Sequence, residues 1–229
     1  MTTRVPASPS SLRVTEIFHS IQGESTRAGE PCVFVRLTGC PLRCTWCDTA
    51  YAFYGGTDMS LEAVVDRVKV YGCSLVEVTG GEPLAQPAAF ELITRLCDER
   101  FEVLIETSGA IDITPVDSRA SVILDVKCPG SEMDDRMRWD NLHHLRQTDQ
   151  VKFVIGDRRD YEWAVDVVKR YRLTETCPVL FSPVFGTGEH DDRDSLLRPL
   201  AEWVLRDRLP VRLQVQLHKF IWDPDTRGV

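Results

Sequence analysis

Short apolar runs alternate along the chain with longer segments whose apolar residues recur every three or four positions. Runs of four to eight apolar residues are typical of buried strands, and the longer spacing is typical of amphipathic helices. The predicted strands are Arg13–Phe18, Val33–Leu37, Leu75–Thr79, Val103–Glu106, Val122–Val126, Val151–Ile155, Val179–Phe181 and Leu213–Leu217. The predicted helices are Leu61–Tyr71, Ala88–Arg100, Tyr161–Arg172 and Ser195–Arg206, with Ser60 and Asp194 placed to cap the first and last.

This order of elements predicts an α/β fold. Strands that alternate with helices form right-handed βαβ units and a parallel sheet. A complete eight-fold barrel typically needs about 250 residues, and this chain of 229 residues offers six βα units at most. We therefore predict a partial (βα)6 barrel, an incomplete TIM-like structure with a mostly parallel sheet.

Length and composition indicate one globular domain over residues 12–229, preceded by a polar, flexible tail over residues 1–11. No apolar run is long enough to cross a bilayer, and the N-terminus lacks the apolar centre of a signal peptide. Eight cysteines without such a signal favour a reducing, cytoplasmic location. The net charge of −8 argues against a broad basic surface for nucleic acid, so we expect neither a nucleic-acid nor a membrane partner.

Three cysteines lie within eight residues directly after the strand Val33–Leu37. Cys40, Cys44 and Cys47 have the spacing C-x₃-C-x₂-C. Thiolates suit zinc or iron–sulfur clusters. Structural zinc takes a fourth Cys or His, and none lies nearby. A cubic iron–sulfur cluster usually takes four cysteines, so three would leave one iron open for another ligand.

Further polar clusters follow the other predicted strands. In parallel α/β structures ligands gather at the carboxyl ends of strands, so these clusters are expected at one rim. Each also has a simpler interpretation: a turn for Gly80–Gly81, local hydroxyl contacts for Thr107 and Ser108, or an exposed ion pair for Asp125 and Lys127. The clusters are Thr79–Pro83, Glu106–Gly109, Asp125–Lys127, Ser182–Phe185 and Gln216–Lys219.

Arg36 is a charge inside an apolar strand. Strand alternation directs it away from the side of Val35 and Leu37. It either faces solvent or points into the barrel, where a guanidinium could form two hydrogen bonds to a substrate carboxylate. His218 follows Gln216 at a predicted strand end, where a structural role and a ligand contact are both open.

The cysteine loop resembles that of the radical S-adenosylmethionine (SAM) enzymes. The resemblance implies that Cys40, Cys44 and Cys47 hold a [4Fe-4S] cluster whose open iron is chelated by SAM. An electron from the cluster would then cleave SAM to a radical. Gly80-Gly81-Glu82-Pro83 resembles the segment that binds the methionine amino group in these enzymes.

The segment Glu16–Ser25 points to one family within this class. Together with Cys47–Thr49, Thr79–Pro83, Glu106–Gly109 and Leu217–Lys219, it resembles the 7-carboxy-7-deazaguanine synthases over about residues 12–220. The resemblance implies a carbon–nitrogen lyase that converts 6-carboxy-5,6,7,8-tetrahydropterin to 7-carboxy-7-deazaguanine with loss of ammonia, toward queuosine in tRNA. It also implies Mg²⁺, a homodimer, and an electron donor such as flavodoxin or ferredoxin. The alternatives are a radical SAM activase that makes a glycyl radical on a partner, and a non-catalytic electron carrier or zinc module.

The resemblance also implies residue roles. Thr49 would bind Mg²⁺. The SAM-binding residues would be Trp46, Cys47, Asp48, Gly81, Glu82, Ser108, Asp125, Val126, Lys127, Ser182, Pro183, Val184 and Phe185. The substrate-binding residues would be Ile21, Gln22, Gly23, Glu24, Arg36, Thr79 and His218.

Two departures from the family stand out. Many members have Ser-Pro-Lys in place of Asp125-Val126-Lys127, and some end soon after the His-Lys pair, whereas this chain continues from Lys219 to Val229. The other cysteines are expected to be small buried residues, and Cys128, at a strand end, could also line the site. They are Cys32, Cys73, Cys97, Cys128 and Cys177.

Overall fold

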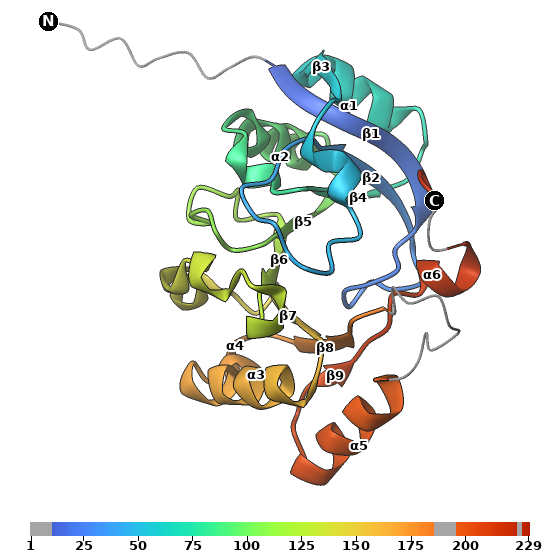
Figure 1. Cartoon of the computed structure of the whole chain (residues 1–229). Coiled ribbons are helices and arrows are strands. Elements are labelled where there is room, and N and C mark those ends of the chain that lie inside the picture. The colour runs from blue at the N-terminus through green and yellow to red at the C-terminus, as the bar shows by residue number, and fades with distance from the viewer. Residues whose placement is uncertain (1–10, 186–195, 224–225) are drawn as a thin grey trace, which may run out of the picture.

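The computed structural model describes residues 11–185, 196–223 and 226–229, and within these ranges it has one nine-stranded sheet. The strand order is β3-β1-β2-β4-β5-β6-β7-β8-β9. Neighbours from β2 to β9 are parallel, whereas β1 pairs antiparallel with both β2 and β3. The sheet curves into an open arc (Figure 1), so the predicted partial barrel and mostly parallel sheet are confirmed.

The elements follow the apolar pattern closely. The strands are β1 Ser11–Ile21, β2 Pro31–Leu37, β3 Thr57–Ser60, β4 Leu75–Gly80, β5 Glu102–Thr107, β6 Ser121–Val126, β7 Gln150–Ile155, β8 Val179–Pro183 and β9 Arg212–Leu213. The α-helices are α1 Leu61–Lys69, α2 Ala88–Asp98, α3 Arg158–Arg170, α4 Leu173–Thr176, α5 Leu197–Asp207 and α6 His218–Ile221. Short 3₁₀ helices cover Ala50–Phe53, Pro83–Ala85, Pro129–Ser131, Asp134–Arg136 and Trp139–His144.

The predicted strand Leu213–Leu217 is wrong, because β9 ends at Leu213 and His218 begins α6. Gln214 N still donates to the Phe181 carbonyl of β8 at 2.9 Å, but beyond it the chain turns to the loop after β1. Gln214 Nε2 donates to the Ser25 carbonyl at 2.7 Å, and Leu217 N donates to the Gly23 carbonyl at 2.9 Å. Figure 1 shows α6 beside that loop.

Further differences concern the tail, the start of α5 and one strand that was not predicted. The expected tail lies outside the described residues except for Ser11, which begins β1. Asp194 and Ser195 also lie outside them, and α5 begins at Leu197. Strand β3 was missed because Thr57–Ser60 carries no apolar run.

The outer face of the sheet carries the main hydrophobic core. Alternate residues such as Val33 and Val35 in β2, and Val76 and Val78 in β4, are fully buried. They pack with apolar residues of α1, α2, α3 and α5, which follow the outside of the arc (Figure 1). Burial of this apolar area is the main force that stabilises the fold.

The inner face of the sheet, opposite these helices, carries both apolar and charged side chains. A small apolar cluster formed by Phe18, Cys32, Phe34, Leu75, Leu104 and Ile123 closes part of it. Nearer the carboxyl ends of the parallel strands, the side chains on this same face are charged. They are Arg36, Glu77, Glu106, Asp125 and Lys152. Charged side chains are rarely buried unless they are paired or functional, so this face is where a site is expected.

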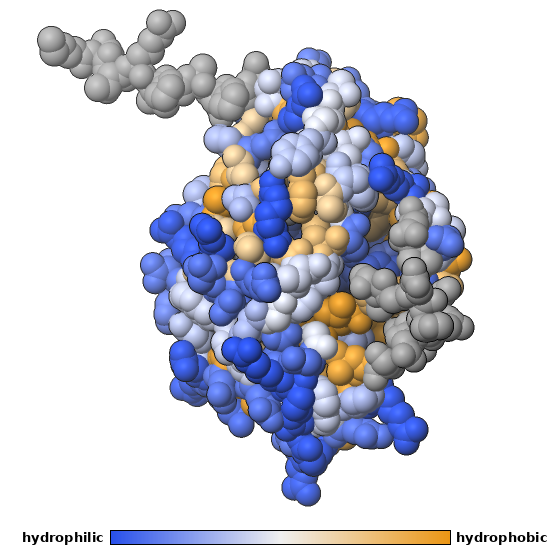
Figure 2. Space-filling view, in the orientation of Figure 1, coloured by the Kyte–Doolittle hydropathy of each residue, from blue (hydrophilic) through white to orange (hydrophobic). Residues whose placement is uncertain are grey.

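Among the described helices none has the length and apolar character to cross a bilayer. On the face seen in Figure 2, apolar residues lie in small groups between polar ones.

The N-cap of α1 gives a testable contribution to stability. Ser60 Oγ accepts a hydrogen bond from Ala63 N at 3.1 Å, as its position in the sequence predicts. We expect Ser60→Ala to lower the free energy of unfolding by about 1 kcal/mol, measured by urea denaturation. The control Ser11→Ala changes an exposed serine that caps no helix and should have little effect; equal losses in both variants would contradict the capping role.

Candidate active site

The cysteine loop leaves the carboxyl end of β2 and runs to the 3₁₀ helix Ala50–Phe53. Backbone hydrogen bonds anchor this loop at two places. Gly39 N, at its start, donates to the Ala52 carbonyl at 2.8 Å, and Thr45 N, in its middle, donates to the Ser131 carbonyl at 3.2 Å. Arg43 Nη1 also donates to the Cys40 carbonyl at 2.7 Å. These bonds hold Cys40, Cys44 and Cys47 at the rim of the sheet, each partly exposed.

The three thiols share one electrostatic environment. Burial raises the pKa of Cys40, Cys44 and Cys47, and the ammonium group of Lys127 acts on each in the opposite direction. Within the described residues no three His, Cys, Asp or Glu side chains converge on a point that would hold a single metal ion. A cubane has its irons at separate corners, so three thiolates from one loop suit a cluster better than a single ion.

The glycines after β4 allow two loops to touch. A Cβ at Gly81 would lie 2.4 Å from the Gly39 carbonyl oxygen and 2.6 Å from Cys40 Cβ, so only glycine fits against the cysteine loop. Glu82 N donates to the same Gly39 carbonyl at 2.9 Å. Gly81 is therefore more than a turn residue, because it sets the distance between the β4 loop and the cysteines.

Glu82 forms a brace between the loops after β4 and β5. Its buried carboxylate accepts hydrogen bonds from Thr107 Oγ1 and Ser108 N, each at 2.8 Å, and from Leu84 N at 3.0 Å. The structure thus brings Glu82 and Ser108 together and directs Thr107 and Ser108 to this carboxylate. Their hydroxyls support the rim of the site.

Asp125 and Lys127 form an ion pair that is largely buried, with 2.7 Å between Asp125 Oδ2 and Lys127 Nζ. Burial would lower the pKa of Lys127, but Asp125 and the Cys44 thiolate raise it above its ordinary value. The other oxygen, Asp125 Oδ1, is buried and has no hydrogen-bond partner among the described residues. A buried acceptor without a partner is costly, so this atom fits a ligand that brings a hydroxyl or amino donor.

Trp46 connects the cysteine loop to the loops after β6 and β7. A Cβ at Gly130 or Gly156 would lie within about 3.0 Å of the indole ring, so both glycines are needed for this packing. Asp160, at the start of α3, accepts hydrogen bonds from Gly130 N at 2.8 Å and Gly156 N at 2.9 Å. Asp160 was not predicted, and nothing short-range in the sequence links it to Trp46.

Asp48 joins the cysteine loop to the chain near α6. Its Oδ2 lies 2.7 Å from Lys219 Nζ and accepts a hydrogen bond from Gln216 Nε2 at 3.1 Å. Burial would raise the pKa of Asp48, but Lys219 and these hydrogen bonds outweigh it and lower the pKa below its usual range. Thr49 Oγ1 donates to Asp48 Oδ1 at 2.9 Å, so the residue expected to bind Mg²⁺ lies beside an ionised carboxylate.

The segment after β1 lies over the inner face. Because β1 is antiparallel to β2, Ile21 pairs with Pro31, and the segment approaches from the edge opposite the cysteine loop. Gln22 Nε2 donates to Glu77, and Gln22 Oε1 accepts from Glu24 N at 3.0 Å.

His218 packs against Gly23, at which a Cβ would lie 2.0 Å from His218 Nδ1. A residue with a side chain could not replace this glycine while His218 keeps its position. The start of α6 and the segment after β1 therefore form one surface, although β9 and α6 come almost 200 residues later in the chain.

Lys152 is the centre of a buried ionic cluster on the inner face. Its side chain is 5% exposed, pairs with Glu24 at 2.8 Å and with Glu106, and lies 3.7 Å from Asp125. Burial would raise the pKa of Glu24, but Lys152 and His218 lower it to about 2. Thr79 Oγ1 donates to Glu106 at 3.3 Å, so Thr79 borders this cluster.

Arg36 points to the inner face and not to bulk solvent. Its side chain is 17% exposed, and its Nε donates to Glu16 Oε1 at 2.8 Å. Tyr51 donates its hydroxyl to the same oxygen at 2.8 Å, and the Arg227 guanidinium stacks 4.3 Å from the Tyr51 ring centre. The chain beyond Lys219 thus returns to the Arg36 side of the site.

The segment after β8 lies next to α6. Ser182 is buried, the Phe185 and Phe220 rings are 5.8 Å apart, and Lys219 Nζ lies 5.1 Å from the Phe185 ring centre. Val184 N donates to the Ile155 carbonyl at 2.8 Å, which fixes the direction in which this segment leaves β8. Ser182–Phe185 therefore lies between the strand ends and α6.

Most of the predicted site residues lie at, or just after, the carboxyl ends of parallel strands. The exceptions are Ile21–Glu24, which comes from β1, and His218 in α6. Of the remaining cysteines, Cys32, Cys97, Cys128 and Cys177 are buried as expected, whereas Cys73 was expected to be buried and is partly exposed. Residues that sequence reasoning left without a role, and that the structure places in the same network, are Glu16, Tyr51, Glu77, Glu106, Lys152, Gln216 and Lys219.

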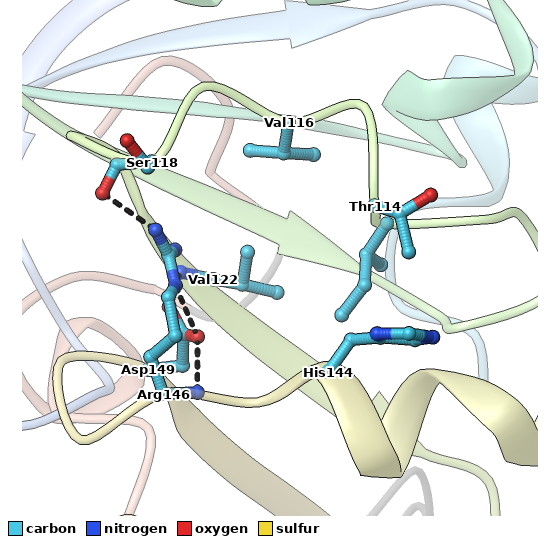
Figure 3. A pocket seen from close by; sticks show the side chains of 8 residues that line it. Thr114, Val116, Ser118, Val122, His144, Arg146 and Asp149 are labelled. Atoms are coloured by element: carbon cyan, nitrogen blue, oxygen red, sulfur yellow. Dashed lines mark hydrogen bonds and ion pairs between the residues drawn. The ribbon is translucent and has the colours of Figure 1, made fainter.

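A cavity of about 200 Å³ lies at the amino ends of β6 and β7, and Figure 3 shows the residues that line it. Asp149 accepts hydrogen bonds from Val122 N at 2.9 Å and Arg146 N at 2.8 Å. The Arg146 guanidinium bonds to Asp149 and to the carbonyls of Ser118 and Ala120. These charges are satisfied within the protein, so we assign this cavity a structural role.

The open parallel sheet, with three cysteines after its first parallel strand, defines a radical SAM protein. The family model of the radical SAM superfamily matches residues 34–199, which include the cysteine loop and the parallel strands through β8. The chain is 44% identical to the 7-carboxy-7-deazaguanine synthase of Chlorobaculum tepidum over the full length of both. It is 46% identical to that of Koribacter versatilis, over 95% of this chain and all of that protein.

The chain therefore belongs to the 7-carboxy-7-deazaguanine synthase family of radical SAM proteins. The crystal structure of QueE from Escherichia coli has the same fold, with a TM-score of 0.71 over 91% of this chain and 95% of that one. At 22% identity this likeness supports the fold alone.

Proposed function

We propose that the chain converts 6-carboxy-5,6,7,8-tetrahydropterin to 7-carboxy-7-deazaguanine with loss of ammonia, as a radical SAM lyase of queuosine biosynthesis. The observation that carries this proposal is the full-length identity of 44% to a 7-carboxy-7-deazaguanine synthase, in a chain whose cysteine loop and Gln22–Glu24 segment face one inner surface. The alternative, a glycyl-radical activase, is not favoured by these relatives.

The cofactors are a [4Fe-4S] cluster and SAM. Cys40, Cys44 and Cys47 would hold the cluster, and the unpartnered Asp125 Oδ1 would accept a hydrogen bond from SAM. When bound, the cluster supplies the electron that cleaves SAM and starts radical chemistry on the substrate. The residues proposed to contact SAM are Trp46, Cys47, Asp48, Gly81, Glu82, Ser108, Asp125–Lys127 and Ser182–Phe185.

The protein positions the substrate between the cysteine loop and the inner face. Arg36 is held through its Nε by Glu16, so its terminal nitrogens would be available to a substrate carboxylate. Thr49, beside the ionised Asp48, would hold Mg²⁺ against the same carboxylate. The Gln22 amide would hold the opposite edge of the ring system, and fixing both ends would align the reacting C–H bond with SAM. The substrate contacts are Ile21–Glu24, Arg36, Thr79 and His218.

The proposal extends to partners and location. A cluster at the rim of the sheet, with partly exposed thiols, is open to an electron donor such as flavodoxin or ferredoxin. A homodimer and a cytoplasmic location are consistent with the family and with eight free cysteines.

An anaerobic turnover assay tests the function. Purified protein, reconstituted with iron and sulfide, is incubated with SAM, Mg²⁺, a reductant and the carboxytetrahydropterin. We expect 7-carboxy-7-deazaguanine and ammonia in equal amounts. Cleavage of SAM without any deazaguanine would instead favour the activase, and the absence of both would reject a radical SAM activity.

The role of Arg36 predicts a change in substrate binding. We expect Arg36→Met to raise the KM for the pterin by roughly 10- to 100-fold, because a charge-assisted hydrogen bond contributes about 1.5–3 kcal/mol. The KM for SAM should stay the same. Arg95→Met, which removes an exposed arginine paired with Glu91 on α2, is the matched control. An unchanged pterin KM in Arg36→Met would reject the role.

A further inference from the structure

Glu77 is a buried carboxyl group that the predicted site does not include. It lies in β4 on the inner face, two residues before Thr79, and is 3% exposed. Its Oε2 accepts a hydrogen bond from Gln22 Nε2. The other end of the Gln22 amide accepts from Glu24 N at 3.0 Å. Glu77 and Glu24 thus hold the Gln22 side chain in one orientation.

The backbone N–H and carbonyl groups of Gln22 also form hydrogen bonds within the protein. Its N–H donates to the Glu30 carbonyl at 2.8 Å, and its carbonyl accepts from Gly29 N at 2.8 Å. A side-chain amide has two N–H donors and two acceptor positions, and one of each is taken by Glu77 and Glu24. The other N–H and the other acceptor position can serve a ligand.

Several ionisable groups face Glu77 from the elements around it. They are Cys32 of β2, Glu106 of β5, Lys152 of β7 and Glu24 of the segment after β1. Burial raises the pKa of Glu77 to about 8; Glu106 and Glu24 add to this, while Gln22 and Lys152 oppose it. At pH 7 the carboxyl group of Glu77 is therefore mostly neutral. The ammonium group of Lys152 instead forms ion pairs with Glu24 and Glu106.

We propose that Glu77 is a positioning residue of the substrate site, because its buried carboxyl group holds the Gln22 amide in one orientation. This inference rests on the proposed function, because that function makes Gln22 a substrate contact. The remaining donor and acceptor of Gln22 match the donor–acceptor edge of a pterin ring. An ionised Glu77 would add a further negative charge beside Glu24 and Glu106 and would weaken binding of a substrate that is itself an anion.

Two variants test the role in the reconstituted, SAM-loaded enzyme. Glu77→Leu leaves the Gln22 amide without its partner, and we expect the KM and the equilibrium dissociation constant for the pterin to rise about tenfold, the usual cost of a buried donor left unpaired. The KM for SAM should not change. Glu77→Gln keeps an acceptor for Gln22 and is always neutral, so it should match the wild type at pH 7.

The pH profile separates positioning from a merely structural role. In the wild type the pterin KM should rise above about pH 8, as Glu77 ionises. In Glu77→Gln this rise should be absent. Titration of His218 does not cause a rise in KM above pH 8, because burial lowers the pKa of His218 below its ordinary value. Val76→Ala, on the opposite face of β4, should lower the melting temperature and leave both pterin KM and pH profile unchanged.

The proposal is overturned if Glu77→Leu binds the pterin like the wild type. It is also overturned if Glu77→Gln shows the same rise in KM above pH 8. Should Glu77→Leu not fold, the comparison of the wild type with Glu77→Gln decides the question. A failure of the proposed function is distinct, because the wild type itself would then yield no deazaguanine, and both proposals would be rejected.

Discussion

Replacing Cys44 by alanine is expected to abolish turnover. The proposed cluster needs three thiolates from one loop, and two cannot hold it with an iron open to SAM. Since the cofactor carries the chemistry, activity should fall to the uncatalysed background, a loss of at least roughly 10⁶-fold by the usual rate enhancement of enzymes. Iron and sulfide analysis, the visible absorption of the reconstituted protein and a deoxyadenosine assay measure the loss.

Cys73→Ala is the matched control for this change. Cys73 is also a partly exposed free thiol, but it lies before β4 and its Sγ donates to the Pro31 carbonyl at 3.2 Å. We expect this variant to bind the cluster and to turn over normally. Before reconstitution both variants should unfold at about the wild-type temperature, because partly exposed side chains contribute little to stability. A Cys44→Ala protein that still held four irons would contradict the assignment of the ligands.

The second large effect is expected from Lys152→Met. Lys152 is 5% exposed and compensates the carboxylates of Glu24, Glu106 and Asp125. Removing one partner of a buried ionic group leaves uncompensated charge and typically costs about 3–5 kcal/mol. We therefore expect the free energy of unfolding, measured by urea denaturation at pH 7, to fall by about this amount.

The pH dependence of this loss has a defined sign. The pKa of Glu24 in the folded protein, about 2, is below its ordinary value of 4.5. Its interaction with Lys152 is therefore a source of stability that is fully present above about pH 4.5 and is lost as the pH falls toward 2. The difference between Lys152→Met and the wild type should shrink over that interval.

Lys69→Met is the control for Lys152. Lys69 pairs with Glu99 at 2.7 Å, but both side chains are more than 40% exposed. Such a pair contributes at most about 1 kcal/mol, so this variant should be close to the wild type at every pH. Equal losses in the two variants would mean that the buried cluster has no special role in stability.

The features that could be predicted from the sequence are those that short segments specify by themselves. The strands contain short apolar runs such as Val33–Val35, and Cys40, Cys44 and Cys47 lie together in one loop. Strand alternation also indicated that Arg36 points away from the apolar side, and the structure places it on the inner face beside Glu16.

The features that could not be predicted depend on partners far apart in the chain. Gln22 and Glu77 are 55 residues apart, and Glu24 and Lys152 are 128 residues apart. One signal was nevertheless available. Glu77 lies between Val76 and Val78, and Lys152 between Val151 and Phe153, in the same alternation that drew attention to Arg36. The end of β9 had no such signal, because it depends on bonds to the loop after β1.

Those bonds have a consequence for the order in which the protein matures. Gln214 and Ser25 are 189 residues apart, and Gln216 and Glu24 are 192 residues apart. The ribosome therefore makes every described strand of the sheet before it makes the residues that hold the segment after β1. Contacts of such wide sequence separation form slowly. During folding, the strands that carry the three cysteine residues can consequently pair before Gln214 and Gln216 fix the segment proposed to bind the pterin.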